Sequence, residues 1–505
     1  MQRNRSVNSP LTLFATIVFV TLALSGCQQM EPNNASGSSN AGTGSGAGKI
    51  AVTTASEEAR KEYLAGRDLQ EKLRITDSIQ HFDKAISLDP NFALAELNRA
   101  NVSPTAKEFF EHLNKAITLS AKASDGERLL IQATEAGANG NPTKQKEVLE
   151  QLVAAYPNDE RAHLNLGGYY FGQQDFKQAI SHYKRATELD SNYSTAFNIL
   201  GYAYRQDENY SDAEVAFKKY IELIPTDPNP YDSYAELLLK MGRFDEAIVQ
   251  YKKALEINQN FLNPHFGIAA ALAYQGKPAD AMAELQKMTD KARNDGERRT
   301  ALFGQMVVAA DSGKLDQALG EVDKQYKLGE KTNDIPAMAG DLQLKGTVLL
   351  EMGRYDDAKK AYEEALKMTN ASSLSKEIKE NTAHFHHYNL ARIAIAQRDL
   401  ETAKKETEEF RKGAEAAKNS ALIKQSHELA GRIALQEKNY DLAITELGQS
   451  NQQNPADIYL LGEAYQGKGD AAKAKESFTK AAKFNSLPAL NYAFIRAKAE
   501  KAIAS

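Results

Sequence analysis

Small, apolar and aromatic residues recur with a period of 34 residues through the middle of the chain. In the first of four successive blocks, Ala179, Tyr183 and Ala186 are spaced i, i+4 and i+7, so they share one face of a helix. Gly167 and Tyr170 mark a helix that precedes it. The pattern predicts consecutive helix pairs stacked into an array. The same positions then hold Gly201, Tyr204, Ala213, Phe217 and Tyr220, next Ala235, Leu238, Ala247, Tyr251 and Ala254, and finally Ala269, Leu272, Ala281, Leu285 and Met288.

The pattern continues on both sides of these four blocks. Towards the N-terminus a first unit begins near Ala59, and a degenerate unit spans residues 93–124. Towards the C-terminus the spacing loosens to between 31 and 45 residues. We count about twelve units, followed by a terminal helix over residues 488–504 that would cover the last apolar face. The markers are Gly66, Ser78, Phe82, Ala85 and Pro90; Ala133, Leu149, Leu152 and Pro157; Gly313 and Ala318; Gly353, Ala358, Tyr362 and Ala365; Ala391 and Ala403; Gly431, Ala443, Leu447 and Pro455; and Gly462, Tyr465, Ala474, Phe478 and Ala481.

This pattern resembles the tetratricopeptide repeat (TPR). The family has a small residue at position 8, a large one at 11, Ala at 20, an aromatic at 24, Ala at 27 and Pro at 32. In this chain Pro225 stands at position 32, where a proline ends the second helix because it lacks an amide donor. The resemblance covers most of the chain and implies an all-α, right-handed superhelical solenoid of about twelve helix-turn-helix units. It leaves the function largely open, since many functions share one fold.

The resemblance also implies where a partner would bind. In the family the first helix of each unit lines a concave groove, and positions 2, 5, 9 and 12 point into it. The mixture of Arg, amide and aromatic side chains at these positions suits an extended peptide or a helix. The alternative is a solvated inner face with no partner. The candidate groove residues are Arg161, Leu164, Phe171, Asn198, Tyr202, Arg205, Asp232, Glu236 and Phe266.

One known binding mode of the family is not expected. A carboxylate clamp for chaperone tails needs Lys at position 5 and Asn at position 9 of a unit. The best units have Asn198 with Tyr202, and Asp232 with Glu236, at these positions.

The first 27 residues follow the order of segments that is typical of a secretory signal peptide. Arg3 and Arg5 precede an uncharged, mostly apolar run over residues 11–24, which is short for a membrane-spanning helix. Leu24-Ser25-Gly26-Cys27 then resembles the lipobox of bacterial lipoproteins, which implies that Cys27, the sole cysteine, is lipidated. Gln28 favours the outer membrane, facing the periplasm, over retention at the inner membrane. The alternative is a plain signal peptide followed by a chance cysteine.

The sequence therefore divides into five segments. Gly, Ser, Asn and Ala dominate the second of them, which cannot bury enough apolar surface to fold and is predicted to be flexible. The segments are a lipoprotein signal peptide (1–26), a lipidated N-terminus with a linker (27–55), a regular TPR array (56–295), a looser TPR array (296–487) and a capping helix (488–505).

Charge and candidate chemistry narrow the function. The formal net charge is −5, and removing residues 1–26 leaves −7, without the basic stripe of a nucleic-acid binder. The histidines at 384, 386 and 387 lack the further ligands of a zinc site, and we find no catalytic motif, so we expect no enzyme, no metal and no cofactor. We expect a membrane-anchored scaffold that binds a protein or peptide. The alternative is a carbohydrate- or cell-wall-binding lipoprotein, although the chain has no Trp to stack on sugars.

Overall fold

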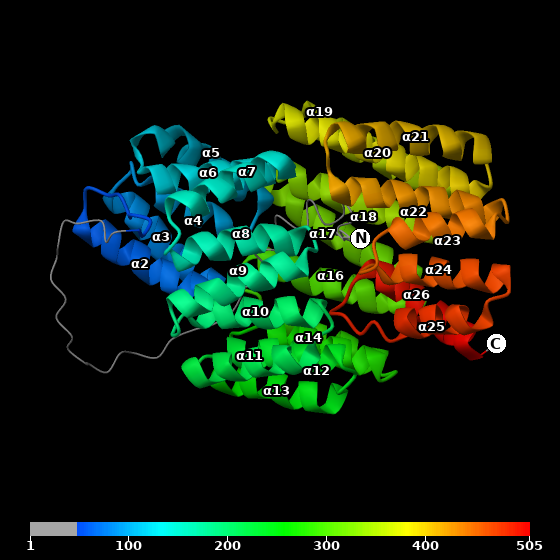
Figure 1. Cartoon of the computed structure of the whole chain (residues 1–505), viewed down its shortest axis with the longest axis horizontal. Helices are drawn as coiled ribbons and strands as arrows, with labels where there is room; N and C mark the ends of the chain where they lie inside the picture. Colours follow the sequence, from blue (N-terminus) through cyan, green and yellow to red (C-terminus); the bar gives the residue numbers. More distant parts are fainter. Residues whose placement is uncertain (1–47, 505) are drawn as a thin grey trace.

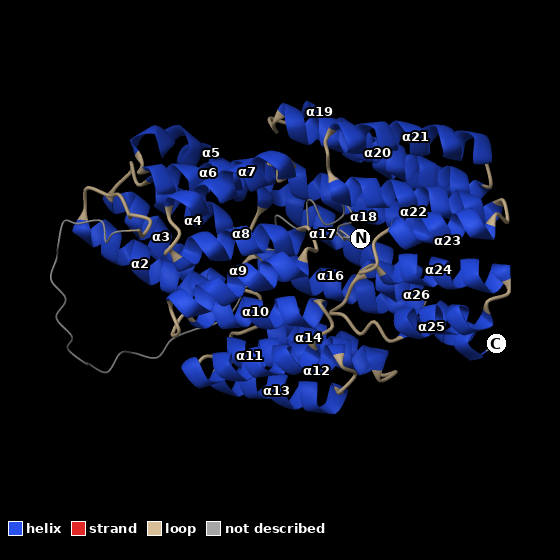
Figure 2. Ribbon diagram, in the orientation of Figure 1, coloured by secondary structure: helices blue, strands red, loops and turns tan. Residues whose placement is uncertain are grey.

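The computed structural model describes residues 48–504, which form 25 α-helices and one short 3₁₀ helix joined by short loops (Figures 1 and 2). The predicted signal peptide and Cys27 lie outside the described residues. The helices are α2 (Glu57–Glu71), α3 (Ile75–Leu88), α4 (Ala93–Asn101), α5 (Ala106–Leu119), α6 (Asp125–Ala138), α7 (Pro142–Ala155), α8 (Glu160–Gly172), α9 (Phe176–Leu189), α10 (Ser194–Gln206), α11 (Tyr210–Leu223), α12 (Asn229–Lys240), α13 (Phe244–Ile257), α14 (Asn263–Tyr274), α15 (Pro278–Lys291), α16 (Asp295–Asp311), α17 (Leu315–Thr332), α18 (Ile335–Glu351), α19 (Tyr355–Ala371), α20 (Lys376–Gln397), α21 (Leu400–Ala416), α22 (Ser420–Gln436), α23 (Tyr440–Gln449), α24 (Pro455–Lys468), α25 (Ala471–Ala482) and α26 (Leu490–Ala504).

Each even-numbered helix from α2 to α24 packs most closely against the odd-numbered helix that follows it. This arrangement makes twelve helix pairs, here called units 1 to 12, from α2–α3 to α24–α25. The predicted all-α array of about twelve helix-turn-helix units is confirmed. The last helix, α26, stands outside the twelve pairs.

Close approach between the two helices of a unit explains the small residue at position 8. A Cβ on Gly201 would lie 2.8 Å from the ring of Phe217, and one on Gly462 would lie 2.6 Å from the ring of Phe478. In unit 9 the equivalent contact is between Gly346 and Tyr362. Gly353, which the sequence pattern used as the marker, instead lies in the turn between α18 and α19 at a φ of 73°.

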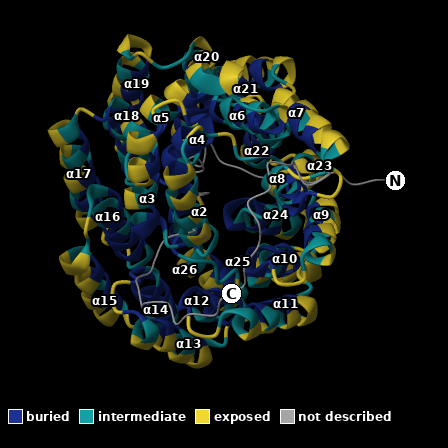
Figure 3. Ribbon diagram, turned by 90° about the vertical axis from the view of Figure 1, so that its left-hand side faces the viewer, coloured by how far each residue is buried: buried dark blue, intermediate teal, exposed yellow. Residues whose placement is uncertain are grey.

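First and second helices of the units differ in burial. In α13 the buried residues are Ala247, Tyr251 and Ala254, which form one stripe, as expected for an outer helix. In α14 nine of twelve residues are buried, so this helix is enclosed on almost every side. Figure 3 shows α9, α11, α13, α15 and α17 along the outer rim, with α2, α24 and α26 inside.

The array winds far enough for its two turns to touch, and we call this line of contact the seam. Units 1 to 5, at the left of Figure 1, meet units 8 to 12, at the right, with an offset of six or seven units. The contacts join Asp77 to Arg293 (3.0 Å), Lys107 to the carbonyl of Thr332 (3.4 Å), Asn139 to Ser375 (2.7 Å), Gln173 to Ser420 (3.0 Å) and Glu208 to Lys480 (2.9 Å).

The chain on either side of the array is also held. Residues 49–55, at the end of the linker predicted to be flexible, are instead held by hydrogen bonds to carboxylates at the junctions of units 1 to 4. Helix α26 packs on α25 and α24, and also on α16 of the preceding turn. Within residues 48–504, no helix combines the length and apolarity needed to span a bilayer.

Candidate protein-binding face

Three side-chain pairs connect α10 to α12 at a constant offset of 31 residues. Asn198 donates through Nδ2 to Asn229 Oδ1 (3.5 Å), and the Tyr202 hydroxyl donates to Ser233 Oγ (3.2 Å). The third pair is an ion pair between Arg205 Nη1 and Glu236 Oε2 (2.9 Å). We call these three pairs the rungs. They bring four of the nine predicted groove residues, Asn198, Tyr202, Arg205 and Glu236, onto one continuous face.

The rungs are partly desolvated and leave hydrogen-bonding atoms unused. Asn198 is fully buried, yet its Oδ1 has no partner within residues 48–504, and the same holds for Arg205 Nε. The Arg205 guanidinium lies 4.6 Å from the centre of the Tyr202 ring, within the range of a cation–π interaction. Leaving a buried polar atom unpaired costs about 1–3 kcal/mol, so these atoms are costly unless a ligand or water meets them.

Asp232 lies on the same face of α12 as Glu236 and is 4 % exposed. No hydrogen bond or ion pair reaches its carboxylate from the described part of the chain. Burial raises the pKa of Asp232 well above its usual range, and the Glu236 carboxylate one turn away raises it further. This face therefore holds a carboxyl group whose ionised form is destabilised.

Arg161 is held by the first unit of the array. Its guanidinium pairs with Glu71 of α2 through Nε (2.7 Å) and Nη2 (3.0 Å), and it stacks 4.9 Å from the centre of the Tyr193 ring. Burial alone would lower the pKa of Arg161, but the hydrogen bond to Glu71 holds it above the usual value. Thr195 also donates to the Glu71 carbonyl (2.7 Å), so the end of α2 lies against α8 and α10.

The three apolar candidates pack inside the array. Leu164 is half-buried against the cluster of Tyr193 and Ala196. Phe171 is half-buried beside Phe176, with ring centres 5.5 Å apart. Phe266 is 6 % exposed and belongs to the core between α14 and α16. Phe266 therefore offers little surface to a partner, whereas Leu164 and Phe171 remain partly exposed.

Sequence reasoning missed the partners that the candidates use. Asn229 accepts hydrogen bonds from Asn198, from Tyr220 (2.9 Å) and from Ser233 (3.3 Å), so it is the centre of the polar face. A search for polar residues 31 apart, rather than 34 apart, would have found the rungs. Glu71 could not be found this way, because it reaches Arg161 from 90 residues away.

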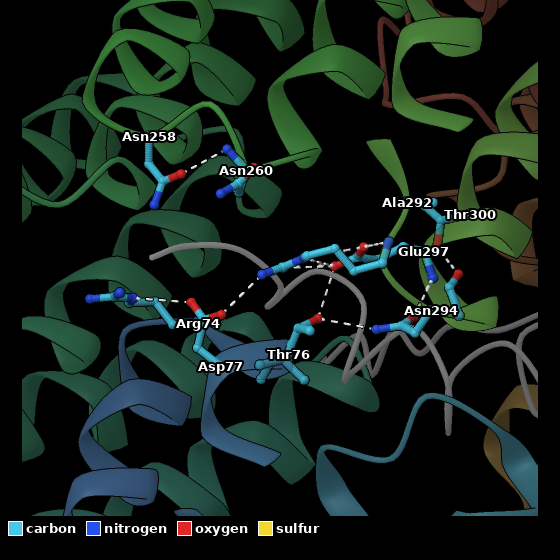
Figure 4. Close-up of polar contacts among 12 residues, drawn as sticks. Arg74, Thr76, Asp77, Asn258, Asn260, Ala292, Asn294, Glu297 and Thr300 are labelled. Atoms are coloured by element: carbon cyan, nitrogen blue, oxygen red, sulfur yellow. Dashed lines mark hydrogen bonds and ion pairs between the residues drawn. The ribbon is translucent and has the colours of Figure 1, made fainter. Parts of the chain in front are cut away.

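The seam gathers another polar cluster where unit 1 meets unit 8 (Figure 4). Arg293 bridges Asp77 of α3 and Glu297 of α16, at 3.0 and 2.8 Å. Thr76 donates to Glu297 Oε1 (2.9 Å) and accepts from Asn294 (3.4 Å). These contacts join the two turns of the array, and Asp77 takes part through Oδ1 alone, since its buried Oδ2 has no hydrogen-bond partner within residues 48–504.

The histidine cluster lies on α20. His387 pairs with Glu406 (2.6 Å), and burial lowers the pKa of His386. Nowhere in residues 48–504 do three His, Cys, Asp or Glu side chains converge as metal ligands.

Comparison with known families agrees with this geometry. Family models described as tetratricopeptide repeat match residues 132–194, 169–228 and 458–486. A TPR repeat model matches residues 235–276, and a tetratricopeptide repeat-like domain matches residues 265–381. The chain is a TPR protein. TPR proteins bind proteins and peptides, and this one is a protein–protein interaction scaffold.

Several solved TPR structures resemble parts of this TPR protein. One from Parabacteroides merdae shares 16 % identity over 51 % of this chain and 96 % of its own (TM-score 0.34). PilF from Pseudomonas aeruginosa shares 17 % identity over 40 % and 91 % (TM-score 0.31). YrrB, described as a TPR protein with an unusual peptide-binding site, shares 22 % over 35 % and 91 % (TM-score 0.24). No curated protein matches the chain.

Proposed function

We propose that this scaffold is tethered to a bacterial envelope membrane through Cys27 and holds a protein or peptide partner on the face that carries the rungs. The lipobox-like residues 24–27 support the tether, and the periplasmic side of the outer membrane is the proposed location. The partner is held near the membrane, while the array supplies the binding surface.

The unused hydrogen-bonding capacity at the rungs carries the proposal. Asn198 Oδ1 and Arg205 Nε are buried atoms without partners in the described residues, and both belong to predicted groove positions. A peptide backbone offers both the N–H that Asn198 Oδ1 can accept and the carbonyl that Arg205 Nε can reach. Hydrogen bonds to a partner would offset the free energy that these two unpaired buried atoms cost.

The array already holds one extended segment by its backbone. The N–H groups of Ile50, Thr53 and Ala55 donate to Asp159 (2.8 Å), Glu127 (2.7 Å) and Asp89 (3.1 Å). Each of these carboxylates comes from a different junction between successive units. Carboxylates at the junctions between units thus bind the backbone N–H groups of an extended segment, as they could bind those of a peptide.

Crosslinking in cells that express the full-length protein tests the binding face. Tyr202→Ala removes a rung and the ring under Arg205, so a partner held here should be lost from the crosslinked product. Arg185→Ala changes an exposed side chain on outer helix α9 and is the matched control. A partner recovered equally with both variants would place its binding elsewhere and refute the proposed face.

The tether is tested separately. Cys27→Ser should release the protein from the membrane fraction and abolish incorporation of a radiolabelled fatty acid. A variant that stays in the membrane fraction and still incorporates the label would refute lipidation at Cys27.

A further inference from the structure

A hollow of about 140 Å³ lies between α17, α18 and α19, where unit 8 meets unit 9. It is separate from the face that carries the rungs. Its volume is comparable to that of an engineered cavity that binds benzene, so a small organic group fits. The hollow is lined by Val322, Asp323, Tyr326, Asp341, Leu342, Lys345 and Glu364.

Asp341 supplies the most buried polar group of this hollow. The residue is 1 % exposed, and its Oδ1 accepts a hydrogen bond from Arg299 Nη2 (2.5 Å). Arg299 is fixed from the other side by the carbonyl of Gln325 (2.7 Å). The second carboxylate oxygen, Oδ2, is buried and has no donor within residues 48–504. One lone-pair site of a desolvated carboxylate is therefore left for a donor from outside.

The rim of the hollow adds negative charge. Asp323 and Glu364 are exposed, and Lys345 pairs with Asp323 (2.9 Å). Glu364 has no ion pair among the described residues. Three carboxylates and one ammonium line the hollow, which leaves a local charge of −2 before the Arg299 guanidinium behind Asp341 is counted. The field at this site therefore favours a cation.

The remaining walls suit the stem of an organic cation better than a bare ion. Val322 and Leu342 are apolar, and the half-buried ring of Tyr326 offers an aromatic surface on which a cation can rest. A metal ion would need several converging ligands, and the described residues hold no such group.

We propose that the hollow between α17, α18 and α19 binds an alkylammonium group, whose N–H donates to Asp341 Oδ2 while its carbon stem packs against Val322, Leu342 and Tyr326. The group comes either from a free small amine or from a lysine side chain of a bound protein. The charge that recognises it is the same in the two cases. The site does not depend on the rungs.

Calorimetric titration of the full-length protein with n-butylammonium chloride tests the site. n-Butanol, which has a similar shape and no charge, is the matched ligand control and should bind at least tenfold more weakly. Asp341→Asn should weaken n-butylammonium binding at least tenfold, and Glu364→Gln, at the exposed rim, two- to fivefold. Asp316→Asn removes the same charge from an exposed position of α17 and should leave the affinity unchanged.

A titration with a lysine-containing peptide and a series at different pH values add two further tests. The blocked peptide Ac-Ala-Ala-Lys-Ala-Ala-NH₂ should bind at least as tightly as n-butylammonium if the natural ligand is a lysine side chain, and more weakly if it is a free amine. Burial raises the pKa of Asp341 to about 6, so affinity should fall as the pH drops from 7 to 5. Asp323, Asp334, Lys345, Glu364, Tyr326 and Arg299 are the other titratable and charged groups around it.

Several outcomes would overturn the proposal. Equal binding of n-butanol and n-butylammonium would show an apolar hollow with no role for charge. Unchanged affinity in Asp341→Asn and Glu364→Gln, each folded by circular dichroism, would place the amine elsewhere. No heat of binding with either amine or peptide would leave water as the only occupant.

Discussion

The inner faces of α10–α12 and of α14–α16 differ in polarity and in whether another helix of the chain covers them. The first is polar, and its rungs leave atoms of Asn198 and Arg205 without partners in the described residues. The second is apolar, and the chain covers it with its own helix α26, whose Tyr492 and Ala493 line one narrow space together with Ala270, Ala273 and Val307. Exposing an apolar face to water costs free energy, so this face is covered by the chain itself. A polar face can stay exposed to water until a partner binds.

Helix α26 is fixed on its face by specific contacts. Arg496 makes two hydrogen bonds to Asp311, at 2.8 and 2.5 Å, and the Tyr492 ring meets that of Tyr274 edge to face with centres 5.5 Å apart. The Tyr492 hydroxyl donates to the carbonyl of Ala482 (2.6 Å). The face under α26 is thus committed to structure, whereas the face with the rungs is the one on which we propose that the partner binds.

Removing α26 should produce the largest effect. Truncation before residue 490 exposes the apolar face and removes Leu490, Tyr492, Ala493 and Ala499 from the core, with an expected cost on the order of 5 kcal/mol. Hydrogen exchange should rise in α14, α16 and α24 first. Unchanged protection of these helices would mean that α26 is not needed to cover them.

Arg496→Ala should cost about 3 kcal/mol, because it leaves the Asp311 carboxylate, with an 8 % exposed side chain, without its ion pair. Urea unfolding measures the loss. Arg185→Ala, at an exposed pair on α9, is the control and should change stability by less than about 0.5 kcal/mol. Equal effects of the two variants would remove the special role given to the Arg496–Asp311 contact.

Asp232→Asn should stabilise the protein by about 1 kcal/mol at pH 7, because it removes a buried charge that has no partner in the described residues. The pKa of Asp232 is higher in the folded than in the unfolded chain. The protein therefore loses stability as the pH rises above the pKa that Asp232 has in the unfolded chain. The gain should therefore shrink as the pH is lowered towards 4. A loss of stability at pH 7 would show that Asp232 has a structural partner.

Asp457→Asn is the matched contrast to that variant. Asp457 is equally buried and burial also raises its pKa, but it accepts hydrogen bonds from Asn451 N–H (2.9 Å) and Asn454 Nδ2 (2.6 Å). Its substitution should destabilise unit 12 by about 1–2 kcal/mol, since an amide cannot serve both donors as well. Opposite signs at Asp232 and Asp457 would separate a buried carboxyl group without a partner in the described residues from one that the fold uses.

The smallest effect is expected at the exposed end of the seam. Lys480 and Glu208 are about half exposed, so Lys480→Ala should change stability by less than about 0.5 kcal/mol. Arg293→Ala, at the more buried contact between units 1 and 8, should cost about 1–2 kcal/mol. Equal effects would mean that burial does not decide how strongly the seam holds the two turns together.

The sequence predicted the helix pairs because each unit repeats its own packing contacts. Gly201 contacts Phe217, which lies 16 residues later, and units 1, 4, 9, 11 and 12 repeat this contact at the same spacing. The seam was not predictable from such a pattern. Arg293 and Asp77 are 216 residues apart, and their meeting depends on small rotations added over seven units.

The sequence predicted which residues share the inner face, but not how buried each side chain is or which partner it contacts. Family register placed Tyr202, Arg205 and Glu236 side by side, which the rungs show. Register alone could not tell that Phe266 is core, because its burial depends on Leu285 of the same unit and on Gly304 of the next unit. It also could not tell that Glu71 holds Arg161, since that contact crosses from the first unit to the fourth.

The central claim is that the polar face of α10–α12 is kept for a partner at some cost in stability. The most direct measurement is the yield of crosslinked partner from cells that express Asp232→Asn, compared with the unmodified protein at equal abundance. We predict that the variant, although at least as stable, captures at most a tenth as much partner. The same partner recovered in the same yield would contradict the account.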